Sequence, residues 1–342
     1  MENRRPARIE DVARVAGVST ATVSRCLNNP STVREATRLT VEAAISELGY
    51  TPNFGARALA MNRTHTVGAV IPTMENAIFA RGFQAVQERL SDAGTTLLIA
   101  SSGYDPDREA SQIRTLLQRG VDGLLLVGES RPDSTYDLVA SRGVPIVLIW
   151  CSGEKTDHVC VGFDNRQAAQ QMARTVLDYG HRRIAMVAGI TAWNDRAARR
   201  VEGVRQALAA ESLTLDEANL VEADYSLEAG AQALRRLMSE TPRPTAIICG
   251  NDVLAAGVLK GARQMNIAVP EELSITGFDD IDLASVLDPA LTTVHVPHRR
   301  MGWTAADRLL AIQSGAPPEG NISFATDLVI RASLTRHNER SS

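Results

Sequence analysis

The chain has 342 residues, which is too long for one small hydrophobic core and predicts two or three domains. Hydrophobic residues make up 44% of it and charged residues 22%, a balance that is ordinary for globular proteins and excludes a largely disordered chain. A polar, arginine-rich start and the lack of about 18 consecutive apolar residues argue against secretion and membrane insertion, so a cytoplasmic protein is expected.

The net charge of −4 is unevenly distributed along the chain. Residues 1–64 contain nine arginines and six acidic residues, a net charge of +3, which leaves −7 for the remaining residues. Basic residues gathered at one end are typical of a small nucleic-acid-binding module attached to a larger domain with another task.

The cysteines indicate neither a zinc site nor a disulfide framework. They lie far apart in the sequence and lack CxxC spacing: Cys26, Cys151, Cys160 and Cys249. We therefore expect reduced, buried thiols, as in a cytosolic protein, and no bound metal.

Residues 9–16 are predicted to form a first helix, with acidic residues in its first turn, where the helix dipole favours them. Its apolar residues follow the helical spacing i, i+3, i+4, i+7: Ile9, Val12, Ala13 and Ala16. Gly17 then supplies the left-handed residue that ends a helix, and Ser19 can cap the next one.

The second helix, which begins after Ser19, has two different faces. Val23, Cys26 and Leu27 share the apolar face. Small or hydrogen-bonding residues share the other: Ala21, Ser24, Arg25 and Asn28. Such a face can approach a groove wall closely, and an arginine bound to a guanine contributes about 1–3 kcal/mol of discrimination, so the pattern predicts a helix that contacts DNA.

A third helix is predicted after Pro30 and ends at Gly49. Its apolar stripe consists of Val41, Ala44, Ile45 and Leu48. Three short helices with a glycine turn between the first two are typical of a helix-turn-helix domain. The periodicity alone also allows three ordinary helices of a larger core.

Residues 9–29, IEDVARVAGVSTATVSRCLNN, resemble the signature of the lactose/galactose repressor (LacI/GalR) family, and the likeness extends to about Arg336. The resemblance implies that Thr20, Ala21 and Arg25 read bases. It implies phosphate contacts for four further residues: Ser19, Thr22, Ser24 and Asn28. Arg34 departs from the family, where a serine commonly caps the third helix, and it can weaken that cap or add a phosphate contact.

Residues 50–64 are expected to form a hinge and linker. Residues 54–60 have helical propensity but are too few for a stable isolated helix, so this segment should be disordered without DNA. By the resemblance, two such helices pair across a dimer on DNA, where Leu59 wedges into the minor groove and Asn53 and Ala56 also contribute. A passive linker is the alternative.

From residue 66 onward, short apolar runs alternate with amphipathic helical stretches, which predicts a doubly wound α/β body with parallel sheets. Strands are expected at residues 66–71, 95–101, 123–127, 145–150, 159–162, 184–188, 245–250 and 273–277. The span is long enough for two sheets, with a ligand between them at the C-terminal strand ends. The resemblance implies a two-lobed body similar to periplasmic sugar-binding proteins, with three crossovers.

The expected division of the chain is a helix-turn-helix domain (1–49), a hinge and linker (50–64), an effector-binding and dimerisation domain (65–337) and a tail (338–342). Within the large domain, lobe one is expected at about residues 65–163 and 296–323, and lobe two at about 164–295 and 324–337.

The motifs of common enzyme classes are missing from the body. No GxGxxG or GxxxxGK[ST] follows a predicted strand, and there is no GxSxG or HExxH. The histidines are scattered, and His181 is expected to hydrogen-bond locally. We therefore predict a protein without enzymatic activity and without a cofactor.

The resemblance implies effector contacts from both lobes. Phe79 belongs to the first lobe, and the others belong to the second: Arg200, Tyr225, Asn251 and Asp279. Trp150 and His298 are weaker matches. Asn251 can alternatively cap the following helix, and Phe79 can be ordinary core.

The chemistry of these residues suits a sugar or sugar acid. Donors and acceptors can bind hydroxyls, and aromatic rings can stack on an apolar sugar face. Trp150 stands where some relatives have a carboxylate, residues 162–165 are similar to gluconate-responsive members, and Arg200 can hold a carboxylate bidentately. Which of Arg196, Arg199 and Arg200 faces the ligand is left open.

Together these features predict a sequence-specific DNA-binding repressor whose affinity for a pseudo-palindromic operator is controlled by a small metabolite between two lobes. A homodimer is expected, through helices at residues 77–90 and 105–118, because two heads need a fixed spacing. Residues 336–342 lack the leucine heptads of a C-terminal coiled coil. We expect a nucleoid-associated protein without membrane contact. The alternatives are a sugar-binding module without DNA function and a sugar-processing enzyme.

Overall fold

The computed structural model describes residues 7–51, 63–153, 156–318 and 320–337. The chain divides into two compact units, Met1–His65 and Thr66–Ser342. The described part of the first unit is helical, and the second is an α/β body, as predicted.

The described part of the first unit consists of α1 (Ile9–Ala16), α2 (Thr20–Asn28), the 3₁₀ turn η1 (Pro30–Thr32) and α3 (Glu35–Leu48). Gly17 ends α1 with φ at 67°, and the Ser19 side chain accepts a hydrogen bond from the Thr22 backbone N–H, so both turn signals are confirmed. One core unites all three helices: Val12, Ala13, Ala16, Val23, Cys26, Val41 and Ala44. The helices therefore have a hydrophobic core of their own.

Lobe one of the second unit is built on a six-stranded parallel sheet in the order β11-β5-β4-β3-β1-β2. Its strands are β1 (Thr66–Ile71), β2 (Thr96–Ser101), β3 (Gly123–Val127), β4 (Ile146–Ile149), β5 (Val159–Gly162) and β11 (Ile322–Ser323). β1, β3, β4 and β5 are buried along their whole length because helices cover both faces.

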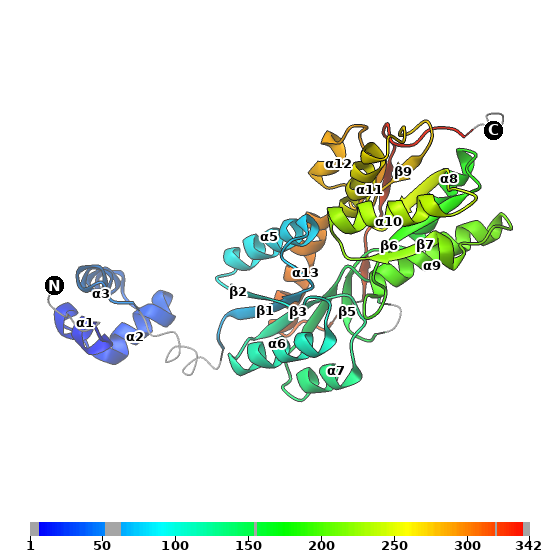
Figure 1. Ribbon diagram of the computed structural model, residues 1–342. Helices are drawn as coiled ribbons and strands as arrows, with labels where there is room; N and C mark the ends of the chain where they lie inside the picture. Colours follow the sequence, from blue (N-terminus) through cyan, green and yellow to red (C-terminus); the bar gives the residue numbers. More distant parts are fainter. Residues whose placement is uncertain (1–6, 52–62, 154–155, 319, 338–342) are drawn as a thin grey trace. The chain divides into compact units, whose positions relative to one another are not determined.

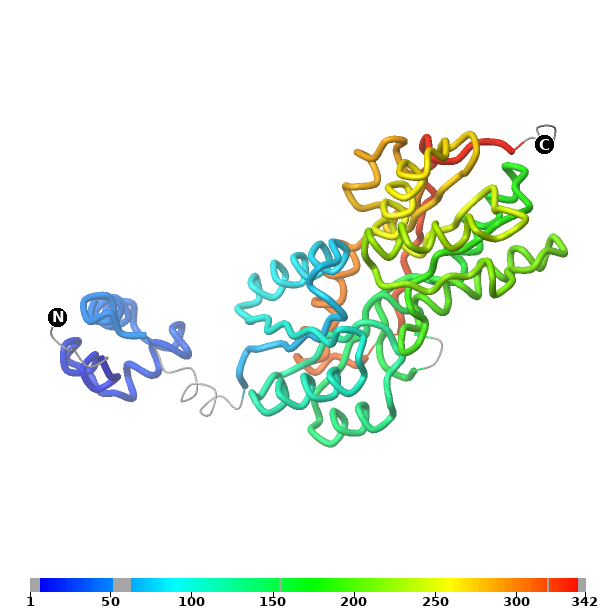
Figure 2. Tube along the Cα trace, viewed as in Figure 1, coloured from blue at the N-terminus to red at the C-terminus, as the bar shows by residue number. Residues whose placement is uncertain are grey.

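The helices of lobe one divide between the two faces of this sheet. α5 (Ala77–Asp92) and α13 (His298–Gln313) pack on one face together with Val67 and Ala69 of β1. α6 (Pro106–Gln118) and α7 (Asp133–Ala140) pack on the other, together with Val70 (Figure 1). Although they lie far apart in the chain, α5 and α13 run side by side (Figure 2).

Lobe two is built on a four-stranded parallel sheet in the order β7-β6-β8-β9. Its strands are β6 (Ile184–Gly189), β7 (Leu220–Ala223), β8 (Ala246–Cys249) and β9 (Ser274–Thr276). α8 (Asn165–Asp178) and α9 (Asp195–Ala210) pack together, as do α10 (Leu227–Ser239) and α11 (Asp252–Gln264). The two helix pairs cover opposite faces of the sheet. Consecutive residues of β6 show this, because Met186 points into the core beneath α8 and α9 and Val187 into the core beneath α10 and α11.

Three chain passages connect the lobes. The chain leaves the first sheet after β5, returns into α13 after β10 (Thr293–His295), and leaves again after β11 for β12 (Asp327–Val329), which pairs antiparallel with β10. The 3₁₀ turn η2 (Glu217–Asn219) and the short helix α12 (Asp282–Val286) complete lobe two. The last passage is the red segment that runs from one lobe to the other in Figure 2.

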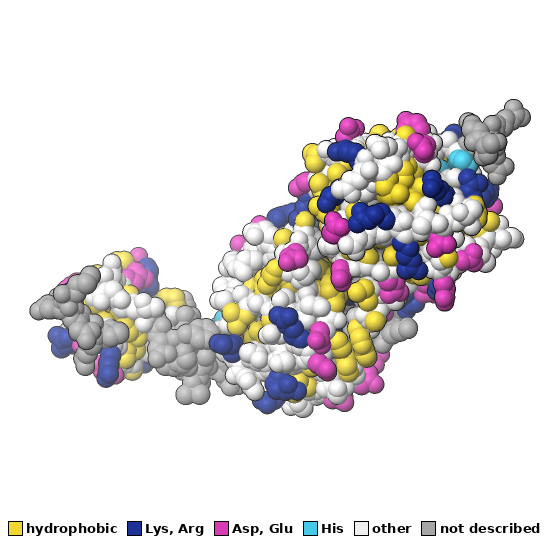
Figure 3. Space-filling view, in the orientation of Figure 1, with side chains coloured by type: hydrophobic (Ala, Val, Ile, Leu, Met, Phe, Trp, Pro, Cys, Tyr) yellow, Lys and Arg dark blue, Asp and Glu magenta, His cyan; other side chains and the backbone are white. Residues whose placement is uncertain are grey.

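All eight predicted strands are present, with bounds that differ by at most one residue at either end. In the described part of the chain, four further strands, β7, β10, β11 and β12, were not predicted. They have two to four residues each and are partly exposed, so they lack a long apolar run. Acidic and basic side chains are interspersed on the face of the second unit that Figure 3 shows.

Candidate functional site

The polar face of α2 is open to solvent. Thr20, Ala21 and Arg25 are exposed, whereas Val23 and Cys26 are buried in the core of the first unit. The guanidinium of Arg25 makes no hydrogen bond or ion pair with any residue that the structure describes. It is therefore free to bind an acceptor outside the chain.

The residues expected at phosphates are held by short polar contacts. Ser19 Oγ and Thr22 Oγ1 lie 2.9 Å apart, and Asn28 Nδ2 donates to Ser24 Oγ at 3.3 Å. These bonds limit the rotamers of the side chains before any ligand binds, which reduces the entropy lost on binding.

Arg34 is the N-cap residue of α3, and its side chain makes no capping hydrogen bond. The structure therefore shows α3 without a side-chain cap from Arg34, and a phosphate contact by Arg34 stays a prediction. The predicted hinge contacts Asn53, Ala56 and Leu59 lie outside the residues that the structure describes.

In the second unit, a pocket lies between the two lobes. Ten residues line it: Asn76, Ile78, Phe79, Tyr104, Trp150, Arg196, Arg200, Tyr225, Asn251 and Asp279. The lining includes six of the seven expected effector residues, which come from segments up to 200 residues apart. The free volume between the side chains is about 20 Å³, enough for about one water molecule.

Arg200 is fixed in one position at this pocket. Its Nε donates to Asn165 Oδ1 at 2.9 Å and its Nη1 to the Gly250 carbonyl at 2.6 Å, while Nη2 lies 3.5 Å from Asp279 Oδ1. The guanidinium also lies 3.7 Å from the ring centre of Phe278. With this many partners, Arg200 is a rigid donor rather than a mobile one.

Two buried carboxyl groups lie at the pocket: Asp279 lines it, and Asp252 lies behind it. Burial raises the pKa of Asp279 to about 6, although nearby Arg200 opposes the shift. Burial and the neighbouring Asp279 raise the pKa of Asp252 to about 7. Asp252 accepts hydrogen bonds from Thr293 Oγ1 at 2.6 Å and from the Ile281 backbone N–H at 2.9 Å, so it joins α11 to the segments that follow β9.

His298 lies behind Trp150 rather than on the pocket wall. Trp150 Nε1 donates to His298 Nδ1 at 3.0 Å, and His298 Nε2 lies 4.0 Å from Asp279 Oδ1. Burial lowers the pKa of His298 to about 3, so the ring is neutral, with its proton on Nε2 because Nδ1 accepts. His298 therefore positions Trp150 and is one step removed from a ligand in this pocket.

Asn251 and Phe79 each have a structural role and also line the pocket. Asn251 caps α11 by accepting from the Leu254 N–H at 2.8 Å, and it also lines the pocket. Phe79 belongs to the core, where its ring lies 5.4 Å from that of Trp150, and it lines the pocket as well.

Three lining residues were missed in the sequence: Asn76, Ile78 and Tyr104. Tyr104 follows β2 with φ at 63°, and two other lining residues, Trp150 and Asp279, also have positive φ, at 66° and 104°. Such backbone conformations cluster at functional sites. No sequence signal marks Tyr104, because its neighbour in space is Tyr225 of the other lobe, 5.7 Å away between ring centres.

The three adjacent arginines of α9 have different roles. Arg196 and Arg200 line the pocket, whereas Arg199 donates to Glu202 at 3.2 Å and lies 4.0 Å from Glu129. Arg196 Nη1 also donates to the Val127 carbonyl of lobe one at 3.4 Å. The start of α9 therefore connects lobe two to lobe one.

Other candidate groups have structural partners. His181 contacts Thr245 Oγ1 and the Thr335 carbonyl, each at 3.0 Å, so it has structural partners, although these lie far from it in the sequence and are not the local ones predicted. The four cysteines are buried and free, and Cys151 Sγ donates to Cys160 Sγ at 3.4 Å. In the described ranges, no group of His, Cys, Asp and Glu side chains is arranged to hold a metal ion. No described helix has the length and apolar character to cross a bilayer.

Known proteins share both the sequence and the fold. Residues 8–53 match the model of bacterial regulatory proteins of the lacI family, and residues 173–334 match a periplasmic binding protein-like domain. The chain is 34% identical over 306 residues to the HTH-type transcriptional repressor PurR of Klebsiella pneumoniae (strain 342), and the alignment covers 89% of each chain.

Solved structures agree with this match. The transcription regulator GntR from Chromobacterium violaceum superposes with a TM-score of 0.74 at 32% identity, over 79% of this chain and 99% of that one. A lac repressor dimer bound to operator and the anti-inducer ONPF superposes with a TM-score of 0.86 at 27% identity, over 97% and 100%. Identity of this degree over most of the chain shows that the protein belongs to the LacI family of bacterial regulatory proteins, DNA-binding transcription regulators that are not enzymes.

Proposed function

We propose that the protein is a cytoplasmic, nucleoid-associated repressor that binds a pseudo-palindromic operator as a homodimer and changes its operator affinity when a small metabolite binds between the lobes of its second unit. The observation that carries the proposal is the convergence of six family-implied effector residues on one pocket. The exposed polar face of α2 supports the DNA-binding part.

The side chains in the pocket suit a hydroxylated metabolite, a sugar or a sugar acid. Arg196, Arg200 and Asn251 offer donors, Asp279 offers an acceptor, and the ring of Phe79 offers an apolar face. Ligand pockets usually measure about 300–1,000 Å³, so the lobes or side chains such as Tyr104 and Arg196 must move to admit a sugar. Binding would therefore be coupled to a change in the lobe arrangement.

The proposed DNA contacts follow the family pattern. Thr20, Ala21 and Arg25 would read base edges, and Ser19, Thr22, Ser24 and Asn28 would bind phosphates. Asn53, Ala56 and Leu59 would act in the hinge. The first unit would then be the DNA-binding domain, and the second unit would bind the effector. The lobe-one helices α5 and α6 would hold the two protomers together.

Two measurements test the proposal. Selection of the full chain on random DNA should enrich a sequence with two related half-sites. A thermal-shift screen of D-glucose, D-gluconate and nucleobases should reveal a ligand that raises the melting temperature, because a ligand that binds only the folded state stabilises it. That ligand should change the affinity for the selected DNA. A chain that binds a sugar but enriches no DNA sequence would instead be a solute-binding module.

A further inference from the structure

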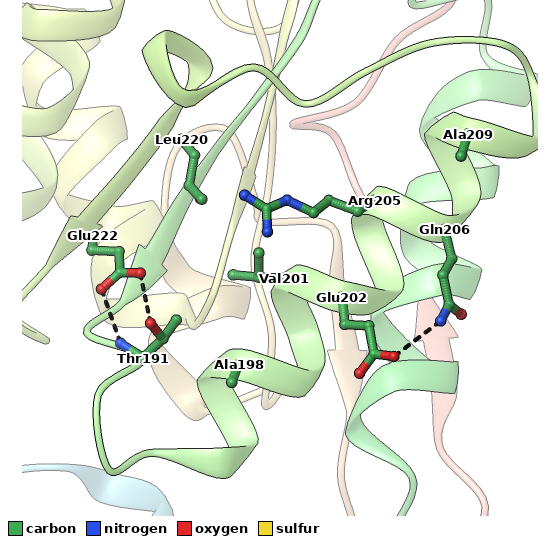
Figure 4. A pocket seen from close by; sticks show the side chains of 9 residues that line it. All are labelled: Thr191, Ala198, Val201, Glu202, Arg205, Gln206, Ala209, Leu220 and Glu222. Carbon is green, nitrogen blue, oxygen red and sulfur yellow. Dashed lines mark hydrogen bonds between the residues drawn. The ribbon is translucent and has the colours of Figure 1, made fainter.

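A second hollow lies on lobe two, away from the pocket between the lobes. It has a volume of about 420 Å³ and lies between α9 and the edge strand β7 (Figure 4). Nine residues line it: Thr191, Ala198, Val201, Glu202, Arg205, Gln206, Ala209, Leu220 and Glu222. We call it the α9–β7 groove. Its volume falls within the usual range for ligand pockets of about 300–1,000 Å³.

The groove and the effector pocket share no lining residue, although both use α9. The groove residues of α9 fall at the spacing i, i+3, i+4, i+7 from Ala198 to Arg205, which places them on one face of the helix. Arg196 and Arg200 reach the other site. The groove is therefore a separate cavity and not an extension of the effector pocket.

The two acidic side chains of the groove already have partners. Glu222 accepts hydrogen bonds from Thr191 N at 3.0 Å and from Thr191 Oγ1 at 2.7 Å. Glu202 accepts from Gln206 Nε2 at 3.2 Å and from Arg199 Nη1 at 3.2 Å, and Arg166 Nη1 lies 3.6 Å from it.

Arg205 differs from these acidic residues. Its side chain extends from α9 across the hollow, above Val201 and toward Leu220 (Figure 4). It makes no hydrogen bond or ion pair with any residue in the described parts of the chain. The groove thus combines an unpaired guanidinium with a floor of Ala198, Val201 and Leu220.

We propose that the α9–β7 groove binds a medium-chain aliphatic monocarboxylate. Its carboxylate would form a bidentate pair with Arg205, the arrangement that a guanidinium fork favours, and its alkyl chain would lie on the apolar floor. The α9 residues that line the groove, from Ala198 to Ala209, extend over about 16 Å of helix, so there is room for a medium-length alkyl chain beside the Arg205 guanidinium. No aromatic side chain lines the groove, so a linear chain fits better than a flat ring.

Titration calorimetry on the full chain with octanoate tests the proposal. Octanol lacks the charged group and its hydrogen bonds to Arg205, so it should bind at least about tenfold more weakly than octanoate. Acetate lacks the alkyl chain and its apolar contacts, so it should also bind at least about tenfold more weakly. Benzoate should also bind more weakly than octanoate. Octanol or benzoate binding as tightly as octanoate would overturn the proposed ligand class.

Variants locate the binding. Arg205→Gln should weaken octanoate binding about tenfold. Arg236→Gln, which changes an exposed arginine of α10 outside the groove, should leave it unchanged. Glu222→Gln should strengthen binding because it removes a negative charge from the groove. Circular dichroism melting curves establish that each variant is folded.

Two results would overturn the site. One is no saturable octanoate binding to the folded wild-type chain. The other is binding that Arg205→Gln leaves intact and Tyr225→Ala abolishes, since that places octanoate in the pocket between the lobes. DNA plays no part in these titrations, so either result leaves the proposed regulatory function standing.

Discussion

Asp195 Oδ2, at the start of α9 in lobe two, accepts a hydrogen bond from the backbone N–H of Glu129 in lobe one at 3.2 Å. The other oxygen of the same carboxylate accepts from Arg196 Nη1 at 3.0 Å, and that guanidinium lines the effector pocket. One carboxylate therefore both connects the lobes and orients a residue of the proposed site. This contact makes the arrangement of the lobes testable by substitution.

Asp195→Ala should loosen the contact between the lobes. The observed closed form has a free volume of only about 20 Å³ and must open to admit a ligand, so a larger population of the open form should raise the apparent affinity. Loss of a hydrogen bond to a charged group corresponds to about a tenfold change. Calorimetry with the ligand found in the thermal-shift screen measures it. Asp178→Ala, on the exposed surface of α8, is the matched control. Equal affinity in wild type and Asp195→Ala would contradict the role of this contact.

Gly128→Ala should act in the same direction by a different mechanism. Gly128 has φ at 75°, and a Cβ atom there would meet the side chains of Arg196 and Asp195. The substitution therefore displaces the Asp195 and Arg196 side chains, which contact lobe one in the observed arrangement, in addition to straining the backbone. Small-angle X-ray scattering should show a larger radius of gyration than for wild type. Gly143→Ala is the control, because it has φ at 63° but an open surrounding.

Arg25→Ala should lower the affinity for the selected operator by about 1–3 kcal/mol, the usual effect of losing a bidentate contact to a base. The exposed side chain has no partner in the described residues, so folding should be unaffected. Fluorescence anisotropy with selected and scrambled DNA separates sequence reading from general attraction. If the loss is equal on both DNAs, Arg25 binds phosphates instead of bases.

Arg196→Ala and Arg199→Ala should differ in their effect on effector binding. Arg196 lines the pocket, whereas Arg199 binds Glu202. We expect Arg196→Ala to weaken binding of the screened ligand by about tenfold and Arg199→Ala to leave it nearly unchanged. Both variants remove one positive charge from α9, so general electrostatics cannot account for a difference. Equal losses would place the ligand elsewhere.

Asp252→Asn should change how stability depends on pH. Burial raises the pKa of Asp252 to about 7 from the ordinary aspartate value of 3.8. Between these values the unfolded chain has released the proton while the folded chain retains it, so this group lowers stability as pH rises. The asparagine variant lacks this term and should gain stability relative to wild type from pH 4 to pH 7, by about 1.4 kcal/mol for each unit of raised pKa.

Urea unfolding of the second unit at several pH values measures this difference. The asparagine can keep both hydrogen bonds, because its oxygen accepts from the Ile281 N–H and its amide donates to the Thr293 hydroxyl. Burial lowers the pKa values of His181 and His298 to about 4 and 3, and these groups reduce stability at acid pH in both proteins. A constant difference between the two proteins across the range would show that Asp252 does not titrate in this way.

Much of the fold could be predicted from the sequence because its signals are local. The glycine at position 17 and the serine at position 19 specify a turn through backbone and capping preferences that do not depend on distant residues. Strands such as β1 and β3 are continuous apolar runs because both faces of a parallel sheet are buried. β11 and β12 carry no such run, and each pairs with a strand more than 30 residues away.

The sequence alone determined the helical head, the α/β body and the residue types available for binding, because capping, periodicity and apolar runs act over a few residues. Only the tertiary structure decided that Tyr104 faces Tyr225, that Arg196 and Arg200 rather than Arg199 line the pocket, and that α9 borders a second cavity. These relationships arise from the packing of segments far apart in the chain, and the local sequence around each residue does not predict such contacts.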